Sequence, residues 1–343
     1  MSPATPYAHL HTSPSGPGDA RPTALQIIAD ENLTHALPNT TIVLTGATSG
    51  IGLETARALL TTGATLYLPV RSIPSARASL STLLSQYGEA QIQLVEMDIS
   101  SLASIKRAAA EILSLTKQQI NVLIANAGIM GLPTKTLSAD GFEMHFAVNY
   151  LGHFYLFQML KDALLATASA TGRASRVVVV SSSTQRAGNV NIADGWDYNF
   201  ETAEYSFHDA YNNAKLAAVW MANGIERVYG GRGLHATSLH PGAIDTNISR
   251  YVGREFVAAL LAHESIAKVV KSPEQGAATT VWAAVGKEWE GRGGRYLENC
   301  GEAGEGVDDG QIFGTGFVPR TYDDAGERKL WGKMCALLKV EEQ

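Results

Sequence analysis

TIVLTGATSGIG, residues 41–52, joins a short apolar run to an amphipathic segment through a turn that carries three glycines. Glycine lets the backbone turn sharply and lets a phosphate approach the first turn of the following helix, where free N–H groups and the helix dipole favour anions. The spacing is G-x-x-x-G-x-G rather than the commoner G-x-G-x-x-G. The stretch therefore predicts a strand, a nucleotide-binding turn and a helix. The residues expected to contact the nucleotide here are Gly46, Thr48, Ser49, Gly50, Ile51 and Gly52.

Outward from this stretch, apolar runs of strand length alternate with longer amphipathic segments. Consecutive apolar residues such as Val177–Val180 are typical of strands buried on both faces. Alternating strands and helices with right-handed crossovers form a doubly wound parallel sheet. We predict an α/β, Rossmann-type fold with a seven-stranded parallel sheet. The predicted strands are 41–45, 65–70, 92–97, 121–126, 176–181, 234–240 and 294–298.

The chain has 343 residues and no visible repeat or domain-sized linker, so we expect one domain over residues 23–343. Residues 1–22 are rich in Pro, Ser and Gly and are expected to form a flexible or loosely docked tail. A short helix is predicted over residues 23–33. Substrate-side insertions are expected at about 186–210 and 247–272, and within the second the amphipathic stretch 251–270 predicts a helix.

Composition excludes several classes of protein. Hydrophobic residues make up 45% and charged residues 17%, as in a soluble globular protein. A net charge of -6 argues against nucleic-acid binding, which needs a positive excess. The sequence contains no run of 18 apolar residues, so no membrane span is predicted. Two cysteines, Cys300 and Cys335, suggest reduced thiols in a cytoplasmic protein.

The segment LPVRSIP follows the second predicted strand and bears on the choice of nucleotide. A site for NAD usually has an acidic residue here to bind the ribose 2′-hydroxyl. This chain has Arg71 instead, whose guanidinium suits a 2′-phosphate, so NADP(H) is the expected cofactor. The alternative is a solvated arginine. Asp98, with Ile99, follows the third strand and is expected at the adenine, the alternative being a helix-capping acid.

The stretch YNNAK places Tyr211 and Lys215 four residues apart, on one face of a helix. A tyrosine titrates near ~10, too high for ready proton exchange at neutrality. An ammonium about 4 Å away, at an effective dielectric of ~20, is worth roughly 4 kcal/mol and is expected to lower the pKa of the phenol. The spacing alone is weak, so its meaning depends on the motifs that precede it.

Those motifs form an ordered set. TGATSGIG, NAG (126–128), VNYLGHF with Asn149, SSS (181–183), YNNAK and HPGAIDT (240–246) resemble the short-chain dehydrogenase/reductase family in order and approximate spacing. Beyond residue 246, SPEQGAATTVWAAVG and GRYLENCGEA resemble its retinol-dehydrogenase-like and WW-domain-oxidoreductase-like branch. The predicted helix before the glycines is similar to one found in fungal members.

The resemblance implies that Tyr211 is the general acid/base, Lys215 its electrostatic partner, Ser182 the hydroxyl that polarises a carbonyl, and Asn149 a member of a proton relay. It implies an NADP(H)-dependent oxidoreductase, a carbonyl reductase or ketoreductase that acts on the carbonyl or alcohol group of a fairly apolar small molecule. A non-redox isomerase or lyase, and a nucleotide-sensing protein without turnover, are the alternatives. The residues implied at the nicotinamide are Asn126, Ala127, Gly128, Tyr211, Lys215, Pro241, Gly242, Ile244 and Thr246.

The insert before Tyr211 is expected to form a rim over the substrate pocket. Its aromatic residues either line that pocket or anchor the insert; they are Trp196, Tyr198, Phe200, Tyr205 and Phe207. The insert abuts the helix that usually forms the family's dimer contact, so a homodimer stays an open alternative. No metal is expected, since the spacing of His145, His153 and His240 does not suggest a metal site.

Overall fold

The computed structural model describes residues 3–191, 195–253, 258, 263–311 and 314–341. Its centre is an eight-stranded sheet in the order β3-β2-β1-β4-β5-β6-β7-β8. The strands are β1 Thr41–Leu44, β2 Thr65–Val70, β3 Ile92–Glu96, β4 Val122–Ala125, β5 Ser175–Val180, β6 Leu234–His240, β7 Arg295–Glu298 and β8 Gly301–Glu302.

The predicted fold class is confirmed, with one addition at the edge of the sheet. All seven predicted strands are present, and each pairs in parallel with its neighbours. The two-residue strand β8 adds an antiparallel pairing to β7, with Leu297 opposite Glu302. The prediction of seven strands missed β8 because two residues carry no readable alternation of apolar and polar side chains.

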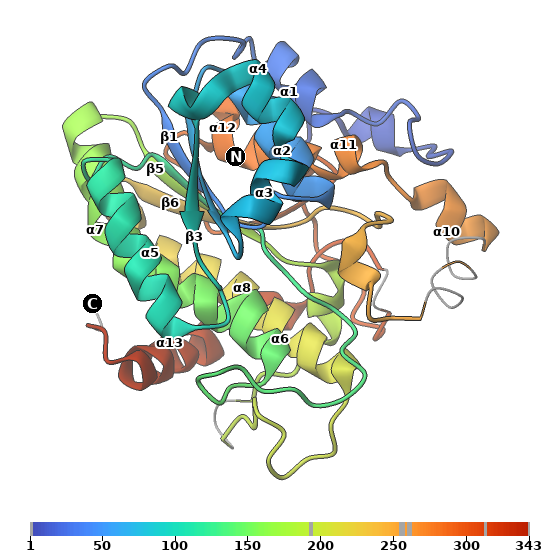
Figure 1. The fold of residues 1–343 in the computed structure, drawn as a ribbon. Helices are drawn as coiled ribbons and strands as arrows, with labels where there is room; N and C mark the ends of the chain where they lie inside the picture. The colour runs from blue at the N-terminus through green and yellow to red at the C-terminus, as the bar shows by residue number, and fades with distance from the viewer. Residues whose placement is uncertain (1–2, 192–194, 254–257, 259–262, 312–313, 342–343) are drawn as a thin grey trace.

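Helices cover both faces of the sheet (Figure 1). One face carries α1, α2, α3, α4, α11 and α12, and the other carries α5, α7, α8 and, packed on α8, α13. A separate apolar core fills each interface. The helices are α1 Ala24–Asp30, α2 Gly50–Leu60, α3 Ile73–Ser79, α4 Ser81–Gln91, α5 Leu102–Leu115, α6 Met144–Phe146, α7 Gly152–Thr171, α8 Phe207–Tyr229, α10 Glu264–Val269, α11 Pro273–Gly276, α12 Ala278–Val285 and α13 Asp324–Leu338.

Local sequence explains where several helices begin and end. Thr23, Ser101 and Ser206 cap α1, α5 and α8, and each side-chain oxygen accepts a hydrogen bond from an N–H of the first turn. Gly172 ends α7 with φ +66°, a left-handed conformation that suits glycine. The predicted helix over 23–33 is thus present as α1, shorter than expected.

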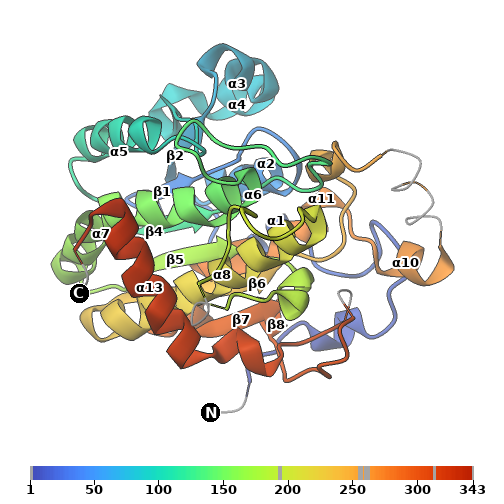
Figure 2. The same ribbon diagram turned by 90° about the horizontal axis from the view of Figure 1, so that it is seen from below.

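The N-terminal segment, residues 3–22, for which composition predicts a flexible or loosely docked tail, makes specific contacts with the rest of the chain. It includes the 3₁₀ helix η1, Ala8–His11, and it follows a defined path from beside β8 toward α10 (Figure 2). Arg21 is only 4% exposed and donates hydrogen bonds to the carbonyl oxygens of Val269 and Val270. Polar anchors therefore order a segment that is poor in apolar residues.

Of the predicted helix over 251–270, the described residues include α10, Glu264–Val269, and residues 254–257 and 259–262 lie outside the described residues. Among the residues that are described, no helix is long and apolar enough to cross a membrane. Cys300 and Cys335 are buried and form no disulfide.

Candidate active site

The carboxyl ends of the parallel strands meet at one edge of the sheet. The strand order reverses between β1 and β4, and a cleft at such a reversal is the usual ligand site in open α/β sheets. A pocket of about 990 Å³ opens there. Asn126 follows β4, Ser182 follows β5 and Pro241 follows β6, so three successive strands each deliver a predicted site residue to it.

The glycine turn is built to keep side chains out. Gly46 has φ +72° and Gly50 has φ +54°, both in the left-handed region. A Cβ on Gly52 would lie 2.1 Å from the carbonyl oxygen of Gly46, so only glycine fits there. Helix α2 begins at Gly50, and the side chain of its cap Ser49 makes no capping hydrogen bond. The turn therefore fits a phosphate-bearing cofactor.

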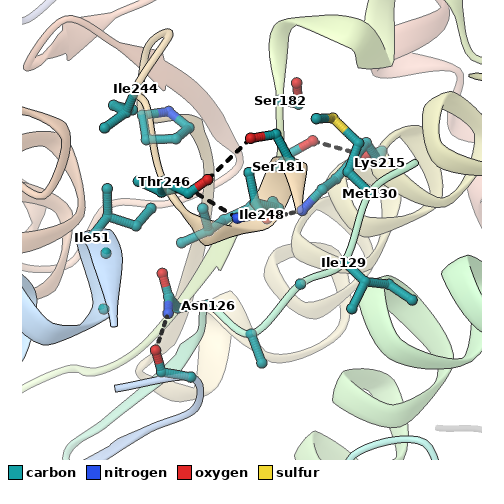
Figure 3. A pocket seen from close by; sticks show the side chains of 18 of the residues that line it. Ile51, Asn126, Ile129, Met130, Ser181, Ser182, Lys215, Ile244, Thr246 and Ile248 are labelled. Carbon is teal, nitrogen blue, oxygen red and sulfur yellow. Dashed lines mark hydrogen bonds between the residues drawn. The ribbon is translucent and has the colours of Figure 1, made fainter. Parts of the chain in front are cut away.

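Asn126 supports the turn from the neighbouring strand. Its Nδ2 donates to the carbonyl oxygens of Thr45, at 2.8 Å, and Gly46, at 3.3 Å. Figure 3 shows Asn126 and Ile51 on the side of the pocket near this turn. The backbone of the turn is thereby tied to β4, which fixes the width of the cleft.

Arg71 and Asp98 both line the pocket and are exposed. Among the described residues, the guanidinium of Arg71 has no hydrogen bond or ion pair, so it is available to a phosphate. Asp98 already serves its own loop, because Oδ1 accepts from the N–H of Ser100 at 2.9 Å and from its hydroxyl at 2.7 Å. Asp98 therefore stabilises the loop between β3 and α5, and the cap of α5 is Ser101.

Tyr211, Lys215 and Ser182 converge in the pocket. Tyr211 and Lys215 lie on α8 and are buried, and Lys215 Nζ is 5.6 Å from the centroid of the Tyr211 ring. The hydroxyl of Ser182 lies close enough to that of Tyr211 to act on its pKa, and it accepts from the N–H of Thr184 at 3.2 Å. Lys215 Nζ donates to the carbonyl oxygen of Val180 at 2.9 Å. The hydroxyl of Ser181 instead donates to the carbonyl oxygen of Lys215, which leaves Ser182 as the serine paired with Tyr211.

Burial controls the protonation of this pair. It raises the pKa of Tyr211 to about 12, although the hydrogen bond with Ser182 works in the opposite direction. It lowers the pKa of Lys215 to about 8. The prediction that the net pKa of Tyr211 lies closer to neutrality is therefore wrong for the protein alone. The loss of hydration of the buried phenol outweighs an ammonium that lies beside the ring and is hydrogen bonded to the backbone.

Asn149 lies just outside the pocket wall, in a π-helical turn, Ala147–Leu151, between α6 and α7. Such turns are rare and often occur at functional sites. Its side chain pairs with the backbone of Ile129, accepting from the N–H at 2.9 Å and donating to the carbonyl oxygen at 3.0 Å. A Cβ on Gly128 would lie 3.2 Å from Asn149 Oδ1 and 3.7 Å from Lys215 Nζ. Asn149 therefore holds the loop after β4 close to Lys215.

The turn after β6 closes the pocket at the nicotinamide end expected from the sequence. Pro241, Gly242, Ile244 and Thr246 all line it. Lys271, which the sequence analysis did not select, supports this turn from behind. Its Nζ donates to the carbonyl oxygen of Pro241 at 3.3 Å and to Asn299 Oδ1 at 2.9 Å.

Arg186, four residues after Ser182, organises a second wall that sequence reasoning missed. It is 3% exposed, and a Cβ on Gly314 would lie 2.7 Å from its Nη2. Gly314 and Thr315 line the pocket. The carbonyl oxygens that accept hydrogen bonds from its guanidinium belong to Val307, Gln311, Thr315 and Gly316.

The aromatic residues of the insert divide between the two roles that the sequence allowed. Phe207 lines the pocket. Trp196 and Tyr198 pack on Phe146, with ring centroids 5.2 and 4.5 Å apart, and so anchor the insert. Tyr205 anchors it too, because its hydroxyl donates to the carbonyl oxygen of Leu132 at 3.1 Å. Phe200 packs on Tyr205.

Each of the three histidines that the sequence analysis considered has a hydrogen-bond partner within the protein. His145 Nδ1 lies 2.7 Å from Glu143 Oε1, His153 Nε2 lies 2.9 Å from Thr45 Oγ1, and His240 Nδ1 accepts from the N–H of Ser183. Within the described part of the chain, no group of three or more His, Cys, Asp or Glu residues could hold a metal ion.

The pocket thus collects nearly all of the predicted site residues. All of the predicted cofactor residues, together with Ser182, Tyr211 and Lys215, line it, and Asn149 supports it from behind. The residues that sequence reasoning missed come from both ends of the chain. They include His11, Arg21, Lys271, Gly314 and Thr315. No sequence motif identifies these residues, because they come to line the pocket only through tertiary packing.

Comparison with known proteins agrees with this geometry. A family model described as short chain dehydrogenase matches residues 40–194. Short-chain dehydrogenase/reductase prx1 of Penicillium roqueforti is 42% identical over 336 residues, which cover 98% of this chain and 96% of that protein. The WW domain-containing oxidoreductase of Homo sapiens is 34% identical over 82% of this chain and 66% of that protein.

A solved structure of an uncharacterized protein from Mycobacterium paratuberculosis is also similar. Its TM-score is 0.64, with 29% identity over 88% of this chain and 94% of that one. The similarity to a fungal protein and to a WW domain-containing oxidoreductase bears out the branch that the motifs indicated.

Proposed function

The chain belongs to the short-chain dehydrogenase/reductase family, and on that basis we propose that it is an NADP(H)-dependent reductase of a ketone or aldehyde on a fairly apolar small molecule. The observation that carries this proposal is the convergence of Tyr211, Lys215 and Ser182 in one pocket that is continuous with the glycine turn.

The residues suited to hold the cofactor extend along the strand ends. The glycine turn suits the pyrophosphate, and Arg71 suits the 2′-phosphate because a guanidinium binds phosphate oxygens in a bidentate manner. The turn after β6 and the loop after β4 suit the nicotinamide. When bound, this cofactor supplies or accepts the hydride.

The protein's own part is to manage the proton and the oxygen charge. With a pKa of about 12, Tyr211 stays protonated at neutral pH and is a weak acid in the protein alone. Its hydroxyl can still donate to the more strongly basic oxygen that forms when a carbonyl is reduced. The Ser182 hydroxyl can donate a second hydrogen bond to the same oxygen, the kind of electrostatic stabilisation that often dominates such barriers.

Lys215 completes the site. Its buried ammonium lies beside the Tyr211 ring and stabilises the phenolate that remains after proton donation. The hydrogen bond from Lys215 Nζ to the Val180 carbonyl oxygen holds the amine in place. Asn149 contributes by fixing the loop after β4 through the N–H of Ile129. In this way the backbone at the end of β5 fixes the position of the charge.

Apolar side chains around these groups suggest the kind of substrate. They exclude water from the reacting oxygen, and they favour an apolar carbonyl compound over a sugar. Those that line the pocket include Ile129, Met130, Leu132, Met144, Val148 and Val252.

The test is NADPH oxidation, followed by absorbance, with a panel of apolar ketones and aldehydes. We expect turnover that falls about a hundredfold or more in Tyr211→Phe, since general acid catalysis contributes about that much, while NADPH still binds. Tyr205→Phe is the matched control, because that phenol anchors the insert. Turnover unaffected by Tyr211→Phe would remove this residue from the mechanism. A product formed without change in nicotinamide absorbance would instead favour an isomerase or lyase, and tight NADPH binding without any turnover would favour a sensor.

A further inference from the structure

The N-terminal segment, residues 3–22, is attached to the body of the protein at points along its whole length. Near its start, the carbonyl oxygen of Ala4 accepts from the N–H of Glu302 in β8, at 2.8 Å. The hydroxyl of Tyr7 donates to Asp30 Oδ2 in α1, at 3.0 Å. These contacts bring the 3₁₀ helix Ala8–His11 against the open side of the pocket.

The end of the segment is fixed by two buried side chains. Gln275, which is 1% exposed, accepts from the N–H of Gly18 and donates to the carbonyl oxygens of Asp19 and Arg21. Arg21 pairs with Asp19 at 2.8 Å and donates to the carbonyl oxygens of Val269 and Val270. The segment is therefore tied to the substrate-side helix α10 and to α11.

Between these anchors, the segment contributes His11 and Pro14 to the wall of the pocket. His11 Nε2 is buried and has no hydrogen-bond partner among the described residues. Burial, followed by the charges of Lys271 and Arg21, lowers the pKa of His11 to about 4, while Asp19 acts in the opposite direction. The imidazole is thus neutral at neutral pH. A buried polar nitrogen without a partner is costly unless a ligand satisfies it.

Building on the proposed function, we propose that the N-terminal segment is part of the substrate site and that His11 Nε2 donates a hydrogen bond to a second oxygen atom of the substrate. An acceptor is favoured over a donor because two cations lie near the imidazole. The adjoining wall, Pro14, Ile266 and Val269, is apolar. The substrate class is therefore an apolar carbonyl compound with one further oxygen function, such as a carboxylate or ester, away from the reacting carbon.

The test compares two ligands that differ only in the second oxygen function, 2-heptanone and 6-oxoheptanoate. Their Kd values for the NADP⁺-loaded protein are measured by ligand-observed NMR, without turnover. We expect 6-oxoheptanoate to bind more tightly. In His11→Phe its advantage should shrink about three- to tenfold, the effect of one hydrogen bond, and His11→Gln should retain part of it. His9→Phe is the matched control, because His9 is exposed on the same short helix.

Three results would overturn the inference. These are no preference for 6-oxoheptanoate in the unmodified protein, an unchanged preference in His11→Phe, or a loss in NADP⁺ affinity in place of ketone affinity. Releasing the segment with Gln275→Met, at an uncharged anchor outside the pocket wall, should reproduce the His11→Phe result, and an unchanged preference for 6-oxoheptanoate would overturn the role of the segment. The Kd values are measured without turnover. An absence of NADPH oxidation would therefore reject the proposed function, whereas the comparison of the two ligands would still test the role of His11.

Discussion

Burial of the charged Lys215 side chain is expected to lower the free energy of unfolding of the protein. This side chain is 2% exposed, and burial lowers its pKa from the ordinary 10.5 to about 8. Since each pKa unit corresponds to about 1.4 kcal/mol, keeping this amine charged at neutral pH costs about 3 kcal/mol relative to the unfolded chain. The hydrogen bond to the Val180 carbonyl offsets about 1 kcal/mol of this.

The sign of the pH dependence follows from the lowered pKa. Between about pH 8 and about pH 10.5, the unfolded chain binds a proton that the folded protein has lost, so stability from this group rises as the pH rises. Below about pH 8 the lysine is charged in both states and its full cost is present. Lys215→Met should therefore be about 1–3 kcal/mol more stable than the unmodified protein at about pH 7, and this difference should shrink by about 2 kcal/mol by about pH 10.

The assay is urea unfolding of the cofactor-free protein and of Lys215→Met, across this pH range. Lys271, whose pKa burial also lowers to about 8, and the buried tyrosines titrate in both proteins, so their effects cancel in the difference. Activity should be lost in the variant. A stability difference that does not change with pH, or a variant that is less stable at every pH, would refute the claim that burial of the charge is the dominant cost.

Two further predictions concern Arg71, which lines the pocket, and Arg186, which holds the loop that contributes Gly314 and Thr315 to it. Arg71→Ala should weaken NADPH binding about tenfold or more, since a charge-assisted hydrogen bond is lost, and should leave NADH binding nearly unchanged. Fluorescence titration of both cofactors measures the two affinities. Equal losses of affinity would overturn the assignment of Arg71 to the 2′-phosphate. Arg186→Lys should raise KM for the ketone about tenfold and leave NADPH affinity unchanged, because an ammonium cannot donate hydrogen bonds to several carbonyl groups as a guanidinium does. Steady-state kinetics measures this KM. An unaltered KM would show that the loop held by Arg186 does not contact the substrate.

The sequence was sufficient for features that are encoded locally. The strand runs, the glycine turn and the spacing of Tyr211 and Lys215 each specify a conformation within a few residues. Because parallel strands end at one edge of the sheet, their order also brought Asn126, Ser182 and Pro241 to one pocket.

Other features depend on contacts between distant parts of the chain. The sign of the pKa change of Tyr211 depends on burial, which its neighbours in sequence do not reveal. The composition of the N-terminal segment is typical of disordered chains. The segment is held by residues that are distant in sequence, such as Gln275, which lies 254 positions beyond Arg21 and donates a hydrogen bond to its carbonyl oxygen. Trp196 and Tyr198 anchor the insert because Phe146, from another element, lies beneath them.

The short strand β8 and the hydrogen bond from Glu302 to Ala4 have a consequence for how copies of this chain meet. A bare sheet margin presents a row of unpaired amides and carbonyls, which invites another polypeptide to dock as an added strand. Here the chain covers that margin with its own first residues. Association by strand addition is therefore disfavoured at this border of the sheet, whose other edge strand is β3.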